Sequence, residues 1–116
     1  MKRLLKPRFQ VPDRDVFYAF KAQTAGLVVG VVDVTKTSAN GQVRVLDNNN
    51  NPLAQAHWEH RGSATVVARI NKDQTFKVGS TRRWDSDADA YCTFYWLPFG
   101  SGSATALALE DPEPNT

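Results

Sequence analysis

The sequence feature that most constrains the fold is a run of asparagines at 48–51, which lies between Asp47 and Pro52. Asn and Asp tolerate left-handed backbone and hydrogen-bond their own main chain, and proline cannot donate to a strand ladder. The run therefore predicts a turn. Strand-like segments precede it at 42–46 and follow it at 53–58, so the middle of the chain is predicted to be a β-hairpin.

Turn signals of glycine, asparagine and aspartate divide the rest of the chain into short apolar and β-branched runs. The predicted strands cover residues 15–22, 27–34, 42–46, 53–60, 64–70, 74–80 and 90–97. The segment at 104–110 has alanines and leucines that favour a helix and an alternation that favours a strand, so both remain open. About eight short antiparallel strands, flanked by extended N- and C-terminal arms, predict an all-β sandwich or jelly roll.

The run at 27–34 is almost continuously apolar. Such a run predicts a central strand that is covered on both faces. Gly30 within it indicates a bulge or the close approach of another part of the chain.

The length of 116 residues allows one domain with a single core. We expect a basic extended arm at 1–14 and a β-sandwich domain at 15–97. Residues 98–116 would form a Gly/Ser link, the undecided last element and an acidic tail that contains prolines. The arm carries the residues expected to contact an assembly, which are Lys2, Arg3, Lys6, Arg8 and Phe9.

Charge and cysteine content narrow the expected partners. A net charge of +2 is too small to argue for nucleic acid, so nucleic acid is not an expected partner. The single cysteine excludes an internal disulfide and favours a reducing compartment or a fold that needs no disulfide. Lys6, Pro7 and Arg8 interrupt the apolar run of a signal peptide, and no run is long enough for a membrane span. We expect cytosolic synthesis and no membrane partner, with association with a virion as one outcome, and secretion if a leader has been removed.

Several short patterns follow one another between 15 and 97. They are Asp15, Tyr18, Phe20 and Ala22; Ala25-Gly26 before Leu27-Val28-Val29; Val43-Arg44-Val45-Leu46-Asp47 before Pro52-Leu53-Ala54; Gln74-Thr75-Phe76-Lys77-Val78; and Tyr91-Cys92-Thr93-Phe94. In this order they resemble the bacterial pre-peptidase C-terminal β-sandwich family, which has a glycine in place of Gln74. The resemblance implies a β-sandwich that is a non-catalytic appendage of secreted proteases, some of which bind calcium, collagen or other polymers.

An acidic loop is the candidate metal site. Asp85, Asp87 and Asp89 alternate as the carboxylates of a calcium loop do, because a hard ion needs several converging oxygen ligands. Ala90 stands where such a loop has the glycine of its sharp turn, so a solvated acidic loop is the alternative. The turn that starts at Asp47 repeats the alternation with a single charge. No cofactor is expected, and calcium at the acidic loop is the alternative.

The chain has three tryptophans, and they differ in expected role. Trp96 lies in the most aromatic of the predicted strands and is expected in the core. Trp84 lies in a polar loop, and with Arg82, Arg83 and Trp58 it forms the candidate binding site. A Trp–Arg cluster of this kind suits an interface with a protein, and an exposed indole equally suits stacking on a glycan.

No serine, cysteine or glycine pattern matches a catalytic motif, and Cys92 in a strand interior is expected to be a buried, inert thiol. We therefore expect a non-enzymatic structural or accessory protein that binds a larger protein assembly through its arms and the rim of its sandwich. A viral capsid decoration or cement protein and a filament subunit are examples, and the chain would be a homo-oligomer or a repeated subunit. The alternative is a polysaccharide- or collagen-binding module of the pre-peptidase type, with calcium at the acidic loop.

Overall fold

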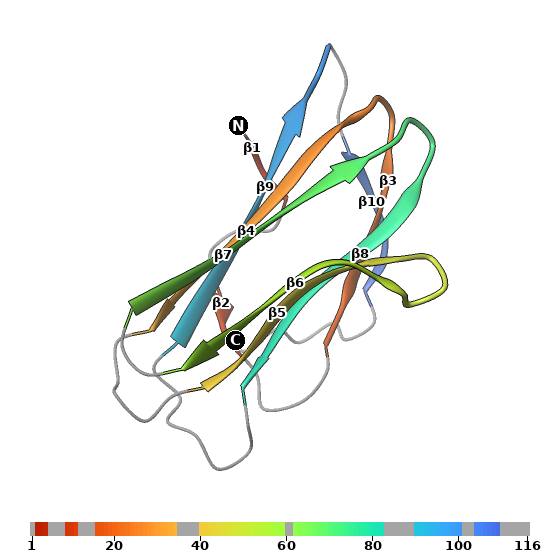
Figure 1. Cartoon of the computed structure of the whole chain (residues 1–116). Coiled ribbons are helices and arrows are strands. Elements are labelled where there is room, and N and C mark those ends of the chain that lie inside the picture. The colour runs from red at the N-terminus through yellow and green to blue at the C-terminus, as the bar shows by residue number, and fades with distance from the viewer. Residues whose placement is uncertain are drawn as a thin grey trace.

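The computed structural model describes residues 2–4, 9–11, 16–34, 40–59, 62–82, 90–100 and 104–109 (Figure 1). These residues form ten strands and no helix, so they include no helix that could cross a membrane. The strands are β1 (Lys2–Arg3), β2 (Phe9–Gln10), β3 (Tyr18–Ala22), β4 (Gly26–Val34), β5 (Asn40–Asp47), β6 (Pro52–Glu59), β7 (Gly62–Ile70), β8 (Thr75–Arg82), β9 (Ala90–Pro98) and β10 (Ala104–Leu109). Eight of them have five residues or more, which confirms the predicted all-β class and the number of strands.

The strands form two antiparallel sheets that face each other as two layers (Figure 1). In sheet A the order is β1–β9–β4–β7, and β2 also pairs with β9. In sheet B the order is β10–β3–β8–β5–β6. From β6 onward each successive strand lies in the opposite sheet, so neither layer is completed by one stretch of chain. This architecture is the predicted sandwich.

The core lies between the two sheets, because alternation directs every second side chain of each strand inward. In β4 the alternation holds along the whole strand, and Val28 and Val32 are fully buried. Three aromatic rings occupy the middle of the core. Phe20 stacks on Phe76 with ring centroids 5.7 Å apart, and Phe76 stacks on Trp96 at 5.9 Å. Since Phe76 belongs to sheet B and Trp96 to sheet A, this stack joins the layers.

The described part of the N-terminal segment, where a basic extended arm is expected, pairs with sheet A. β1 and β2 both pair with β9, with Lys2 opposite Trp96 and Phe9 opposite Cys92. Val11 is 1% exposed, and its amide donates to the carbonyl of Ala90 at 2.8 Å. The physical reason is that the outer edge of β9 offers main-chain groups that need partners, and apolar Val11 gains from burial. Lys6 and Arg8 lie outside the described residues.

The segment whose structure the sequence left open, 104–110, forms strand β10 over Ala104–Leu109. It pairs antiparallel with β3, with Ala104 opposite Ala22 and Ala106 opposite Phe20. The segment forms a strand because the edge of β3 offers main-chain hydrogen-bond partners, although its alanines and leucines have helical propensity. The sandwich thus extends beyond the boundary expected at residue 97. The acidic tail at 110–116 lies outside the described residues.

Gly30 supplies a test of how tightly sheet A packs. It lies on the core-facing side of β4, where an added Cβ would be 2.5 Å from Cε1 of Phe94 and 3.1 Å from Cγ2 of Val66. We expect Gly30→Ala to lower the free energy of unfolding by about 1–3 kcal/mol, because overpacking forces rings out of place. Urea denaturation measures the effect.

Gly100→Ala is the matched control, because an added Cβ there would meet nothing within 4 Å. It should change the free energy of unfolding by less than about 0.5 kcal/mol. Equal losses in the two variants would contradict the close packing of Gly30.

Candidate functional site

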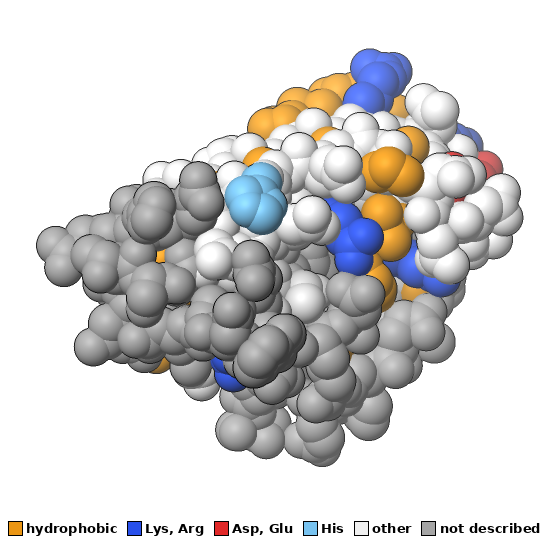
Figure 2. All heavy atoms as spheres, turned by 60° about the horizontal axis from the view of Figure 1, so that its bottom comes forward, with side chains coloured by type: hydrophobic (Ala, Val, Ile, Leu, Met, Phe, Trp, Pro, Cys, Tyr) orange, Lys and Arg blue, Asp and Glu red, His pale blue; other side chains and the backbone are white. Residues whose placement is uncertain are grey.

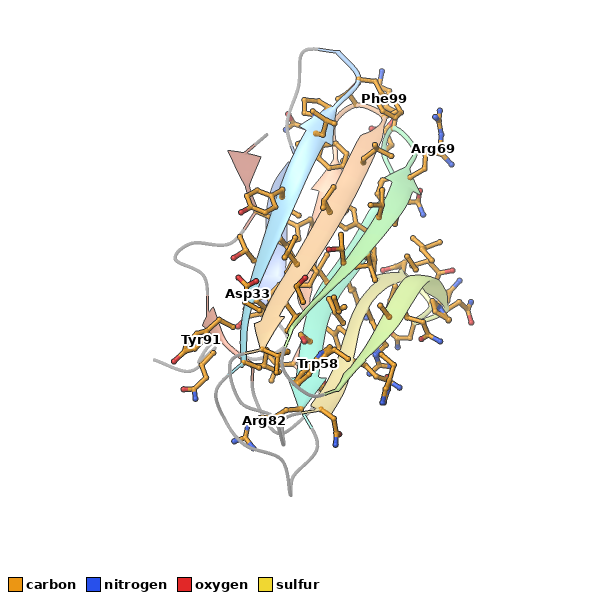
Figure 3. The ribbon with its side chains drawn as sticks, turned by 60° about the vertical axis from the view of Figure 1, so that its left-hand side comes forward. Asp33, Trp58, Arg69, Arg82, Tyr91 and Phe99 are labelled. Carbon is orange, nitrogen blue, oxygen red and sulfur yellow. The ribbon has the colours of Figure 1, made fainter. Side chains whose placement is uncertain are left out.

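The structure places two residues of the predicted Trp–Arg site, Trp58 and Arg82, at the same end of the sandwich (Figure 3). Gly41 on β5 lies opposite both of them, since β5 pairs with β6 on one side and β8 on the other. Arg82 is half-buried, and its Nε donates to the carbonyl of Val11 at 3.2 Å. The bond ties the end of β8 to the N-terminal segment. Arg83 and Trp84 lie outside the described residues.

Trp58, the second tryptophan of the candidate binding site, is buried. Its side chain is 3% exposed and belongs to the core. An added Cβ on Gly41 would lie 2.6 Å from Cζ2 of Trp58, so the glycine leaves room for the indole. A ring face that is buried against its own chain cannot stack on a glycan or insert into a partner. Trp96, at 2% exposure, is in the core as predicted.

The predicted calcium residues Asp85, Asp87 and Asp89 lie outside the described residues. Within the part of the chain that the structure describes, no group of three His, Cys, Asp or Glu side chains is placed to hold a metal ion.

The asparagine turn uses its carboxylate to hold its own backbone. Oδ1 of Asp47 accepts the amides of Asn49 at 2.8 Å and Asn51 at 2.9 Å. Asn50 takes a positive φ of 65°, and its side-chain oxygen accepts a hydrogen bond from Nζ of Lys77 at 2.9 Å. The backbone hydrogen bond from Asn51 lowers the pKa of Asp47, because it stabilises the charged carboxylate. The turn closes the β5–β6 hairpin, as the sequence predicted.

Cys92 is buried and unpaired, and desolvation raises the pKa of its thiol well above the ordinary value, with a smaller contribution from the charge of Asp33. The prediction that Cys92 is buried is confirmed, and a thiol that stays protonated is a poor nucleophile.

The structure adds a surface that sequence reasoning missed, the outer face of sheet A. Its members are the outward side chains of the three long strands: Leu27, Val29, Val31 and Asp33 on β4; Ser63, Thr65, Val67 and Arg69 on β7; and Tyr91, Thr93, Tyr95 and Leu97 on β9. They form rows across the sheet. Val29 lies between Val67 and Tyr95, and the next row has Val31 at its centre.

The charged side chains that the three long strands place on this face lie at its two ends, while β1 adds Arg3 to the row of Tyr95 at the margin of the sheet. Arg69 and Asp33 are its charged members, and they lie at opposite ends (Figure 3). The guanidinium carbon of Arg69 lies 5.0 Å from the centre of the Phe99 ring. Val67 is 53% exposed, Phe99 52% and Leu97 39%. Between these two ends, the side chains of the three long strands are apolar or hydroxylated, and Thr93 among them is buried.

The outer face of sheet B is of a different character. Its outward side chains include Lys21, Gln42, Arg44, Gln55, His57, Thr75, Lys77 and Thr81. Figure 2 shows the histidine and several Lys and Arg side chains on the side that carries the β5–β6 hairpin. Phe17 lies over Gly79 there, with the guanidinium carbon of Arg44 5.1 Å from its ring centre. A polar face of this kind is stable in contact with water, whereas exposure of the apolar outer face of sheet A to water is unfavourable.

The apolar run at 27–34 was the signal that could have located this surface. The prediction that the strand is central is confirmed, because β4 lies between β9 and β7. Its second face is not buried in the described structure, where Leu27, Val29 and Val31 are only half-buried. An apolar strand in a two-layered sandwich leaves one apolar face outward.

No family model, curated protein or solved structure matches the chain. The resemblance to the pre-peptidase family stays a prediction.

Asp47→Ala tests the role of the turn. We expect the variant to unfold at lower urea concentration at pH 7, because the amides of Asn49 and Asn51 lose their acceptor. The folded-state pKa of Asp47 lies below its ordinary value of 3.8, so its contribution is present above that pH and is lost as the pH falls through the folded value. The difference between the two proteins should therefore shrink in acid.

Asn48→Ala, an exposed substitution in the same turn, is the control and should unfold like the wild type at both pH values. A wild-type stability advantage over Asp47→Ala that stays constant down to pH 2 would contradict this account.

Proposed function

We propose that the chain is a non-enzymatic structural or accessory protein that binds a larger protein assembly. A decoration or cement protein on a viral capsid and a subunit of a filament are the kinds of role that this describes. The observation that carries the proposal is the apolar outer face of sheet A, presented by three paired strands.

The composition of this face supports a protein partner. Contiguous exposed apolar surface on a folded domain marks an interaction site more often than scattered apolar residues do. Interfaces with proteins have an apolar centre and a polar rim, and here Arg69 and Asp33 lie at the rim. The β-branched Val29 and Val31 have restricted rotamers, so little side-chain entropy is lost when they become buried.

The dimensions of the face also suit a protein surface. The rows from Leu27 to Asp33 span about 20 Å along the strands, and three strands span about 10 Å across them. A standard interface buries about 800 Å² on each partner. The face therefore supplies the centre of such an interface, and exposed neighbours such as Phe99 would complete it.

The glycan- or collagen-binding alternative rested on exposed tryptophans and on calcium. Trp58 lies in the core, and Trp84 and the acidic loop lie outside the described residues. No observation favours this alternative, so one function is proposed.

Leu97→Glu tests the proposal. The tagged full-length protein is produced in its own host, and the assembly that it joins is isolated and quantified by cross-linking and mass spectrometry. We expect the variant to be recovered with the assembly at least about tenfold less than the wild type, because the interface would bury an unpaired carboxylate.

Leu53→Glu is the matched control. Leu53 and Leu97 have the same exposure of 39%, and Leu53 lies on β6 in sheet B. We expect this variant to join the assembly like the wild type, and both variants to melt at similar temperatures. Undiminished incorporation of Leu97→Glu, or a loss confined to Leu53→Glu, would rule out the outer face of sheet A as the binding surface.

A further inference from the structure

We propose that two copies of this chain associate by pairing β7 antiparallel with β7 of the second copy, about a twofold axis at Val66. The two A sheets would then form one continuous sheet. This self-association goes beyond the binding of a larger assembly and does not depend on it.

The first observation is that β7 ends sheet A with a long, regular edge. It pairs with β4 at nine consecutive positions, from Gly62 opposite Val34 to Ile70 opposite Gly26, without a register shift. Among the described residues, no strand pairs with its other edge. Figure 3 shows β7 at the margin of the sheet, with Arg69 projecting from it. Such an edge presents a row of main-chain donors and acceptors to a further strand.

The second observation is that the other edges are interrupted or covered. β1 and β2 cover the outer edge of β9. β6 begins with Pro52, beside a register shift in its pairing with β5, and β10 has a register shift between Ala106 and Leu109. Proline, bulges and charges at an edge prevent pairing with other chains. β7 contains no proline and no lysine, and Arg69 is its single charged residue.

The third observation is that β7 is complementary to itself. Because the strand has nine residues, full antiparallel pairing places its middle residue, Val66, on the twofold axis. Thr65 of each copy then lies opposite Val67 of the other, and β-branched pairs of this kind are favourable across strands. Ala64 lies opposite Ala68, so small side chains meet on the inner face.

The same register places opposite charges in one row. Arg69 of one copy lies opposite Ser63 of the other, and Ser63 is the neighbour of Asp33 on β4. The Arg69 and Asp33 backbones are then two strand spacings apart, about 10 Å, which an arginine side chain can largely span. No two like charges lie opposite each other. Main-chain hydrogen bonds would form with any strand that adds to this edge. The side-chain pairs and the opposite charges favour a second copy of this chain over an unrelated strand.

Sedimentation velocity of the full-length chain over about 1–200 μM tests the proposal. We expect a species of twice 12.9 kDa that dissociates on dilution. Thr65→Lys combined with Val67→Lys should raise the dissociation constant at least about tenfold, since the introduced lysines would face each other across both halves of the pairing. Thr65→Glu combined with Val67→Lys places opposite charges there and should keep the dimer at low salt.

Gln55→Lys combined with His57→Lys is the control, because it puts the same charges at the same spacing on exposed positions of β6, an edge strand of sheet B. It should leave the dimer intact, and circular dichroism should show that all variants fold. A wild-type chain that stays monomeric at 200 μM would overturn the proposal. A dimer that persists in the Thr65→Lys, Val67→Lys variant would also overturn it. Loss of the dimer in the Gln55→Lys, His57→Lys control would overturn it as well. Dissociation of the Thr65→Glu, Val67→Lys variant at low salt would contradict the proposed register.

Discussion

The contact on which the structure depends is the stack of Phe76 on Trp96. Their ring centroids lie 5.9 Å apart with an angle of 16° between the planes, and Phe20 extends the stack at 5.7 Å. Phe76 comes from sheet B and Trp96 from sheet A, so the rings set the spacing of the layers and contribute large buried apolar areas. Strands from distant parts of the chain meet at this stack, since Phe20, Phe76 and Trp96 belong to β3, β8 and β9.

Wide aromatic rings fit between regular strands here because glycines make room for them. An added Cβ would lie within 3 Å of a ring atom of a buried aromatic residue at three positions: Gly26 beside Trp96, Gly30 beside Phe94 and Gly41 beside Trp58. Close pairing of glycine with an aromatic residue of a neighbouring strand restores the packing that the glycine would otherwise lack. At Gly30 the sequence predicted a bulge or a close approach, and the structure has the close approach, with β4 in unbroken register on both sides.

A sandwich buries the inner face of each sheet. Packing of the core therefore does not dictate which side chains the two outer faces carry. Sheet B turns Lys, Arg, Gln and His side chains outward, as a solvated face does. Sheet A turns out Val29, Val31 and Val67, and it ends in a long edge without the usual protection. The apolar face and the open edge belong to the same sheet, so both proposed contacts involve sheet A.

The sequence by itself determined the strands between residues 15 and 97, the central hairpin and the all-β class. These follow from alternation and turn chemistry, which act between near neighbours, as the hydrogen bonds of Asp47 within its own turn illustrate. Only the tertiary structure decided that Trp58 is core, that Val11 and the short N-terminal strands join sheet A, and that residues 104–109 extend along β3. It also decided that the outward side chains of β4 remain half-exposed. The reason is that exposure depends on which distant strand covers a side chain, and neither local propensity nor spacing contains that information.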